Sequence, residues 1–326
     1  MTGEPILEVV DLCAGYGGAG GTARAVDNVS FELGRGEFLA VVGESGCGKS
    51  TLLFAIARLL SPPARLSGGK VLFRGQNMVA MTDKALRALR WRELSVVMQS
   101  AMNALNPVSP IGAQFADAMK AHGEKDAKVV RARSEQVMTM VGIDPVHLAS
   151  YAHQLSGGMR QRAMVAMALL FSPELILMDE PTSALDVVAQ RSLMVQIKQL
   201  QAELGFAIIF VTHDMSLVSH FSDRVAVMYA GQVVETRPTQ ALFDHPLHPY
   251  TRGLLDSFPS VYGPRELVEG IPGSPPDLAK LPQGCNFSPR CPLALPACPT
   301  TEPELYQAED ALVRCLLYQP ATAPRA

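Results

Sequence analysis

The chain has 326 residues, of which 48% are hydrophobic and 18% charged, a balance that predicts a globular protein with a sizeable core. Its formal net charge of −3 excludes the strong basic bias expected of a nucleic-acid-binding surface. The longest apolar run, 163–171, is far shorter than the roughly 20 residues of a membrane-spanning helix, and residues 1–5 lack signal-peptide character, so we expect a cytosolic protein.

Residues 1–240 alternate between strand-like and helix-like segments, which predicts an α/β fold. Short apolar segments rich in branched residues are the predicted strands, several of them buried and parallel; they lie at 6–12, 25–33, 37–42, 95–98, 175–178 and 207–211. A helix is predicted at 52–60, and 224–236 is predicted to form a hairpin that turns near Gly231.

Two further regions differ from this alternating pattern. Between about 100 and 160 the periodicity predicts helices, at 111–122 and 127–141, and no strand, so we expect a helical subdomain inserted into the α/β core. After residue 240 the composition changes, and 259–300 is rich in proline. We therefore expect residues 1–240 to form the main domain and residues 241–326 to form an irregular extension that needs a crosslink or metal to become ordered.

A glycine-rich segment follows the predicted strand at 37–42 and opens the predicted helix. It reads Gly-Glu-Ser-Gly-Cys-Gly-Lys-Ser-Thr and fits the phosphate-binding pattern G-x4-G-K-[ST]. Its backbone N–H groups can surround phosphate oxygens, Lys49 can reach the β- and γ-phosphates of ATP, and Ser50 can bind Mg²⁺. The alternative is a chance glycine-rich turn, which this context disfavours. The predicted nucleotide-binding residues here are Gly43, Ser45, Gly46, Cys47, Gly48, Lys49, Ser50 and Thr51.

The predicted strand at 175–178 ends in two acidic residues. In a sheet of this kind Asp179 would lie beside the phosphate-binding loop and could hold Mg²⁺. Glu180, the next residue, is placed to orient and polarise the attacking water as a catalytic base. A solvated acidic pair that merely caps the strand is the alternative, and the nearby loop motif makes it the weaker one.

The sequence Leu-Ser-Gly-Gly-Met at 155–159, followed by Arg-Gln-Arg, resembles the signature motif of ABC ATPases. Ser156, Gly157 and Gly158 would begin a helix whose N-terminus can bind an anion. Taken alone, Ser-Gly-Gly before a helix is more often only a cap. In the family this motif faces the γ-phosphate held by another subunit, so the resemblance implies an ABC-type P-loop NTPase core that works as a dimer.

The remaining motifs of the family follow in order, and the resemblance covers residues 6–236. It implies that Tyr16 stacks on adenine, that Gln99 contacts Mg²⁺ or water, and that the loop ending at Asp186 crosses the dimer interface. It also implies that His213 contacts the γ-phosphate as a catalytic residue beside Lys49 and Glu180. The alternatives are an ordinary loop tyrosine at position 16 and a structural or exposed histidine at 213.

The extension resembles the C-terminal region of oligopeptide and dipeptide permease ATPases, through the segment His-Pro-Leu-His-Pro-Tyr at 245–250 and a four-cysteine pattern. The cysteines are Cys285, Cys291, Cys298 and Cys315. The resemblance implies that they ligate a [4Fe–4S] cluster, for which four thiolates in irregular loops are suitable ligands. A zinc site, for which these spacings are wide, and free thiols are the alternatives.

Together these motifs predict an ATPase subunit that powers import of di- or oligopeptides through an ABC transporter. The resemblance implies a second ATPase subunit, two membrane permeases and an extracytoplasmic substrate-binding protein. The second ATPase subunit is either a paralogue, which the subfamily suggests, or an identical copy. It places the chain on the cytoplasmic face of the membrane. The alternatives are import of another solute, such as a nickel chelate or a sugar, a soluble ABC ATPase, and a regulatory subunit with a dead site, although no catalytic motif is degenerate.

Overall fold

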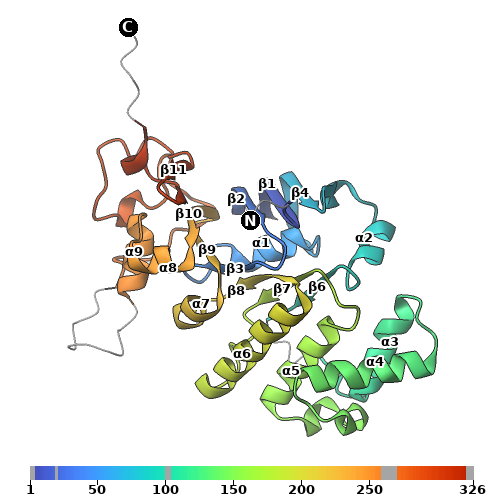
Figure 1. Cartoon of the computed structure of the whole chain (residues 1–326). Helices are drawn as coiled ribbons and strands as arrows, with labels where there is room; N and C mark the ends of the chain where they lie inside the picture. Colours follow the sequence, from blue (N-terminus) through green and yellow to red (C-terminus); the bar gives the residue numbers. More distant parts are fainter. Residues whose placement is uncertain (1–3, 19–20, 100–103, 258–269, 321–326) are drawn as a thin grey trace. The chain divides into compact units, whose positions relative to one another are not determined.

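The computed structural model describes residues 4–18, 21–99, 104–257 and 270–320 (Figure 1). The chain divides into two compact units. The first unit consists of the segments Met1–Leu7, Leu33–Phe38 and Leu72–Phe210. The second unit consists of Glu8–Glu32, Leu39–Val71 and Val211–Ala326. The described residues include no helix that is both long enough and apolar enough to span a membrane.

Three buried strands of the first unit follow the order β8-β7-β6. They are β6 (Leu94–Val97), β7 (Leu175–Asp179) and β8 (Ala207–Val211). β6 and β7 are parallel and in register, and every residue of β7 and β8 is buried. A strand covered on both faces has no polar alternation, which is why continuous apolar runs predicted these strands correctly.

The helices of the first unit follow their sequence signals. α2 (Asp83–Leu89) precedes β6, and α3 (Ile111–Ala121), α4 (Ala127–Met140) and α5 (Gly157–Ala168) lie between β6 and β7, with α6 (Val187–Leu204) after β7. Asp126 caps α4 by accepting a hydrogen bond from the Lys128 N–H group. Of residues 104–156, which are described throughout, none lies in a strand element, so the two helices predicted there are confirmed.

The strands of the second unit form two groups. One has the order β2-β1-β4, from β1 (Leu7–Gly18), β2 (Gly21–Leu33) and β4 (Ala64–Phe73). The other contains β3 (Phe38–Val42), which pairs in parallel with β9 (Arg224–Tyr229), and β10 (Gln232–Pro238), which pairs with β9 as an antiparallel hairpin. The predicted turn lies at Ala230 and Gly231, which both have positive φ.

The extension continues this second sheet, which the sequence did not predict. β12 (Ala311–Val313) pairs with β10, and β11 (Tyr306–Ala308) pairs with β12, so the order is β11-β12-β10-β9-β3. Two helices, α8 (Thr239–Asp244) and α9 (Pro249–Asp256), follow β10, and α7 (Met215–Phe221) precedes β9. Strands of three residues are too short to show a period of two, so no sequence pattern revealed them.

An aromatic cluster anchors the extension to the second unit. The rings of Tyr229, Tyr250 and Phe287 have centroids 4.6 to 5.5 Å apart, and all three side chains are buried. Cys285 and Cys291 pack against the same core. Burying one large aromatic side chain contributes roughly 1.5–3 kcal/mol. Tyr250 and Phe287 thus give the extension a hydrophobic anchor on β9 that the sequence analysis did not predict.

Candidate functional site

The glycine-rich loop lies in the second unit, between β3 and α1 (Lys49–Ile56). Gly43 and Gly48 have φ values of 150° and 109°, a region that other residues rarely adopt. A Cβ atom on Gly48 would lie 1.8 Å from the carbonyl oxygen of Ala25, and one on Gly43 would lie 2.1 Å from that of Met228. Only glycine fits at either position, so the motif is built into the fold and is not a chance turn.

Lys49 begins α1 and places its ammonium group over the loop. Its Nζ donates to the carbonyl oxygens of Gly43, at 2.7 Å, and Glu44, at 2.9 Å, and the residue is buried. No side chain caps the N-terminus of α1, and a helix N-terminus of this kind favours an anion. The loop thus combines a fixed cation with helix amides, which suits it to polyphosphate.

Tyr16 lies on β1 beside this loop. Its hydroxyl is 3.0 Å from the Oγ1 atom of Thr51, a predicted loop residue. The side chain is 41% exposed, which leaves ring surface open to a planar ligand. Stacking on adenine remains a prediction.

The acidic strand end lies in the first unit. Asp179 is the last residue of β7 and is buried, and Glu180 follows with a left-handed φ of 43°. The Nε2 atom of Gln99 donates to the Oε2 atom of Glu180 at 3.0 Å, and the Ser183 hydroxyl donates to the Glu180 carbonyl oxygen at 3.1 Å. The structure therefore brings together the predicted Gln99 and Glu180 side chains, 81 residues apart in sequence.

The signature segment begins α5, as predicted. Ser156 is the N-cap, and its Oγ atom accepts from the Met159 N–H group at 3.3 Å. A Cβ atom on Gly158 would meet nothing within 4 Å, so the packing of this chain does not require glycine there. Asp186 caps α6 in the same way, through the Ala189 N–H group. Both residues have capping roles, and their contact with a second subunit remains a prediction.

His213 lies in the second unit, between β8 and α7, and is exposed. The residues on either side are held by hydrogen bonds: the Thr212 hydroxyl accepts from the Asp214 N–H group, and the Asp214 carboxylate caps α7. The backbone at His213 is thus fixed while its imidazole ring stays accessible. Such an arrangement suits a ring that contacts a ligand, and the predicted γ-phosphate contact remains untested.

The sequence analysis did not predict that the extension contacts the phosphate-binding loop. The guanidinium of Arg290 forms a two-fold ion pair with the Glu44 carboxylate, at 2.7 and 2.9 Å, and the Glu44 N–H group donates to the Tyr250 hydroxyl at 2.9 Å. Glu44 raises the pKa of Arg290 above its ordinary value through these hydrogen bonds. Arg290 adjoins the predicted ligand Cys291, but nothing in the sequence marked it as a partner of the loop.

The four cysteines of the extension are free thiols that influence one another. Burial raises the pKa of Cys315 to about 11, and the neighbouring Cys285, Cys291 and Cys298 add to this rise. The pKa of Cys285 is raised by burial and by two of the same neighbours. Among the residues that the structure describes, no three His, Cys, Asp or Glu side chains are arranged to hold a metal ion. The predicted iron–sulfur cluster is therefore not confirmed.

His248 is a structural residue of the extension. It is buried, and its Nδ1 atom accepts from the Tyr250 N–H group at the start of α9. Burial lowers its pKa from the ordinary 6.5 to about 3. The folded chain thus keeps His248 neutral at pH values where the unfolded chain protonates it.

This depressed pKa predicts a stability that falls as the pH drops below 6.5. For a folded pKa of about 3, His248 alone should cost about 1.4 kcal/mol of unfolding free energy between pH 7.5 and 5.5. Urea unfolding at both pH values measures the loss, and the His248→Asn variant, which retains a capping oxygen, should show a smaller one. Equal losses in the two proteins would contradict the assignment.

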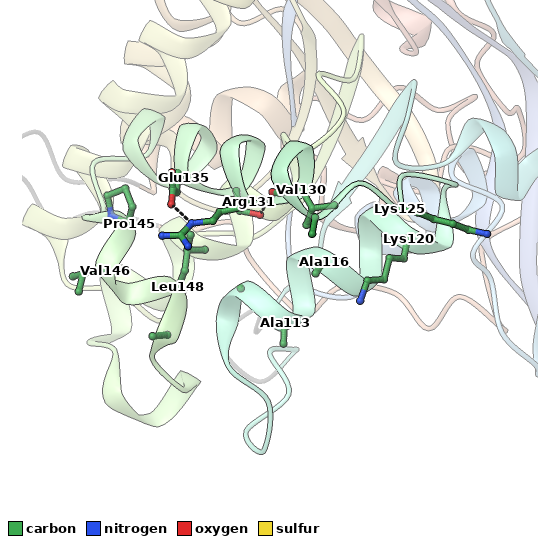
Figure 2. A pocket seen from close by; sticks show the side chains of 14 residues that line it. Ala113, Ala116, Lys120, Lys125, Val130, Arg131, Glu135, Pro145, Val146 and Leu148 are labelled. Atoms are coloured by element: carbon green, nitrogen blue, oxygen red, sulfur yellow. Dashed lines mark hydrogen bonds and ion pairs between the residues drawn. The ribbon is translucent and has the colours of Figure 1, made fainter.

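A separate pocket of about 550 Å³ lies in the first unit, between α3, α4 and the 3-10 helix η3 (Pro145–Ala149). Figure 2 shows Lys120 and Lys125 at one end of it and Pro145 and Val146 at the other. None of its lining residues belongs to the predicted nucleotide site. The pocket therefore takes no part in the ATP chemistry considered below.

Comparison with known proteins supports the motifs. The family described as ABC transporter matches residues 26–183, and the family described as oligopeptide/dipeptide transporter, C-terminal region, matches residues 234–298. The dipeptide transport ATP-binding protein DppD of Caldanaerobacter subterraneus subsp. tengcongensis is 40% identical over 96% of this chain and 97% of its own length. The chain belongs to the ABC transporter ATP-binding family, in its dipeptide and oligopeptide branch.

Other family members match over similar lengths. DppD of Bacillus subtilis is 40% identical over 96% of this chain and 95% of its own length. The oligopeptide transport ATP-binding protein OppD of the same organism is 40% identical over 94% of this chain and 86% of its own length. A solved dimeric bacterial ABC transporter cassette aligns with a TM-score of 0.65 at 26% identity, covering 72% of this chain and 98% of that one. The ABC-type P-loop NTPase fold and the activity of a transport ATPase, both predicted from the motifs, are thereby confirmed.

Proposed function

We propose that this chain binds and hydrolyses ATP to power the import of dipeptides or oligopeptides. The observation that carries the proposal is the steric fit of the phosphate-binding loop, in which only glycine fits at positions 43 and 48. The substrate class rests on similarity to dipeptide and oligopeptide transport proteins that extends through the extension.

The residues of the second unit would bind the nucleotide. Lys49 exchanges its two carbonyl partners for phosphate oxygens, and the first N–H groups of α1 bind further oxygens. Tyr16 offers its exposed ring to adenine, and His213 contacts the γ-phosphate. These groups hold the ground-state nucleotide in place before hydrolysis.

Glu180 would be the catalytic base, held in place by the Gln99 amide. Ser50, Gln99 and Asp179 supply hydroxyl, amide and carboxylate oxygens, the ligands that Mg²⁺ prefers. When bound, Mg²⁺ neutralises phosphate charge. Glu180 then accepts a proton from the attacking water, and Gln99 orients that water.

The signature residues would act on a second subunit. Ser156, Gly157 and Gly158 present the N-terminus of α5, and Gly158 leaves open space where a ligand can approach the backbone. Asp186 begins α6 in the loop expected at the dimer interface. Because each motif occurs once in the chain, two ATPase subunits would complete each other's sites. The resemblance to the oligopeptide permease branch favours a paralogue over a second copy of this chain as the partner subunit.

The assembly would contain two membrane permeases and an extracytoplasmic binding protein, with this chain on the cytoplasmic face of the membrane. Uptake of a labelled dipeptide by cells that lack this chain tests the substrate class. The wild-type chain should restore uptake, and a Lys49→Ala chain expressed to the same level should not. Restored uptake of a nickel chelate or a sugar, without peptide uptake, would contradict the proposal.

The four cysteines are proposed to ligate a [4Fe–4S] cluster with a structural role. The supporting observation is that Cys285, Cys291 and Cys298 lie near enough to Cys315 to raise its pKa, because a cluster of this type needs four thiolates. No metal-binding group is preformed in the described residues, so the thiols would have to rearrange around the cluster. No step of ATP hydrolysis depends on it.

Metal analysis after anaerobic purification tests this cluster. We expect about four iron and four sulfide per chain, and their loss in a variant with Cys298→Ser. The Cys13→Ser variant, in which a cysteine outside the extension is changed, should retain them. One zinc without sulfide would indicate a zinc site, and four alkylatable thiols without any metal would contradict both alternatives.

A further inference from the structure

The extension holds the second residue of the phosphate-binding loop from two directions. The Tyr250 hydroxyl, on α9, accepts from the Glu44 N–H group at 2.9 Å. Arg290, at the end of the 3-10 helix η5 (Ser288–Arg290), forms the two-fold ion pair with the Glu44 carboxylate. All three residues belong to the second unit, so these contacts lie within one compact body.

The guanidinium of Arg290 is held rigidly. Its Nε atom donates to the Pro272 carbonyl oxygen at 2.8 Å, and the group lies 5.8 Å from the centre of the Tyr229 ring. The side chain is 6% exposed, whereas that of Glu44 is 23% exposed. Because the planar guanidinium group of Arg290 is fixed by several contacts, it sets the orientation of the Glu44 carboxylate that it binds.

Glu44 connects Arg290 and Tyr250 to Lys49, the predicted phosphate-binding lysine. Its carbonyl oxygen accepts from the Lys49 Nζ atom at 2.9 Å. Its carboxylate adds a negative charge to a loop that must bind a polyanion, and a like charge at close range opposes binding. Arg290 compensates that charge and also directs the carboxylate toward the extension.

We infer that Arg290 and Tyr250 are positioning residues for nucleotide binding, which makes the extension a working part of the ATP site. They fix the Glu44 end of the loop, and Arg290 cancels the Glu44 charge that would otherwise repel phosphate. The inference rests on the proposed binding of ATP by this loop. It assigns the extension a role in ATP affinity whether or not the cysteines hold a metal.

Equilibrium titration of the purified full chain with Mg-ATP tests the inference. The Arg290→Met variant should bind at least about tenfold more weakly, because it leaves the Glu44 carboxylate uncompensated. Arg314→Met is the matched control: Arg314 is also a buried arginine of the extension, but it donates to the carbonyl oxygens of Val233, Pro303 and Asn28. Its affinity for Mg-ATP should match that of the wild type.

A double variant separates charge compensation from general loss of structure. Glu44→Gln combined with Arg290→Met removes the unpaired charge, so it should recover most of the lost affinity. Arg290→Lys keeps the positive charge but cannot form the two-fold ion pair, so its affinity for Mg-ATP should lie between those of the wild type and Arg290→Met. It replaces Arg290→Met in the test if that variant does not fold. Binding by Arg290→Met within twofold of the wild type, or a double variant as weak as the single one, would overturn the inference. A wild-type chain that does not bind Mg-ATP would instead overturn the proposed function.

Discussion

Replacing Glu180 by glutamine is expected to lower steady-state ATP hydrolysis by the assembled transporter more than tenfold while ATP still binds. Glutamine keeps the size of the side chain but cannot accept the proton of the attacking water. Its backbone position is unchanged, because the Ser183 hydroxyl holds the Glu180 carbonyl oxygen. The variant should therefore accumulate as a closed, ATP-bound dimer.

Phosphate release and equilibrium ATP titration measure the two properties separately. Glu174→Gln is the matched control, because Glu174 is another carboxylate of the first unit, paired with Arg35 and Arg74 at the surface. Hydrolysis by that control should be close to wild type. A loss under tenfold in Glu180→Gln, about 1.4 kcal/mol in the barrier, would show that another group is the main catalytic carboxylate.

Replacing Lys49 by alanine is expected to weaken the binding of ATP itself, by at least about tenfold. The ammonium group is buried above the loop, and by the proposed role it would contact phosphates in the ground state, so its loss should lower affinity before any chemistry. The change also leaves the carbonyl oxygens of Gly43 and Glu44 without their lysine donor.

Equilibrium titration with Mg-ATP measures the effect. Lys84→Ala, which removes an exposed lysine of α2, should leave affinity unchanged. The thermal midpoint of each variant without nucleotide shows whether the fold is retained. Unchanged affinity in Lys49→Ala would refute the role of this lysine.

The parts of the site that could be predicted from the sequence are those determined by residues close together in the chain. The loop between β3 and α1 is specified by glycines whose replacement would clash with the backbone, and the buried strands are specified by continuous apolar runs. Ser156 could be recognised as a helix start because capping acts over three residues.

The parts that escaped prediction depend on contacts between distant segments. Arg290 meets Glu44 across 246 residues, and nothing near either residue indicates the other. β12 is a strand because it pairs with the edge of β10, and β11 because it pairs with β12; strands of three residues are too short to show a sequence period. The aromatic cluster of the extension likewise requires Tyr229 on β9 to meet Phe287.

Peptide-dependent ATP hydrolysis by the reconstituted transporter tests the central claim most directly. The chain would be placed in proteoliposomes with its permeases and second ATPase subunit, and the binding protein would be added with or without a dipeptide. We expect the peptide-loaded binding protein to stimulate phosphate release severalfold above the unloaded protein, and Glu180→Gln to abolish the stimulation. Hydrolysis that is unaffected by peptide, or equal in the Glu180→Gln assembly, would contradict the assignment of this chain as the motor of a peptide importer.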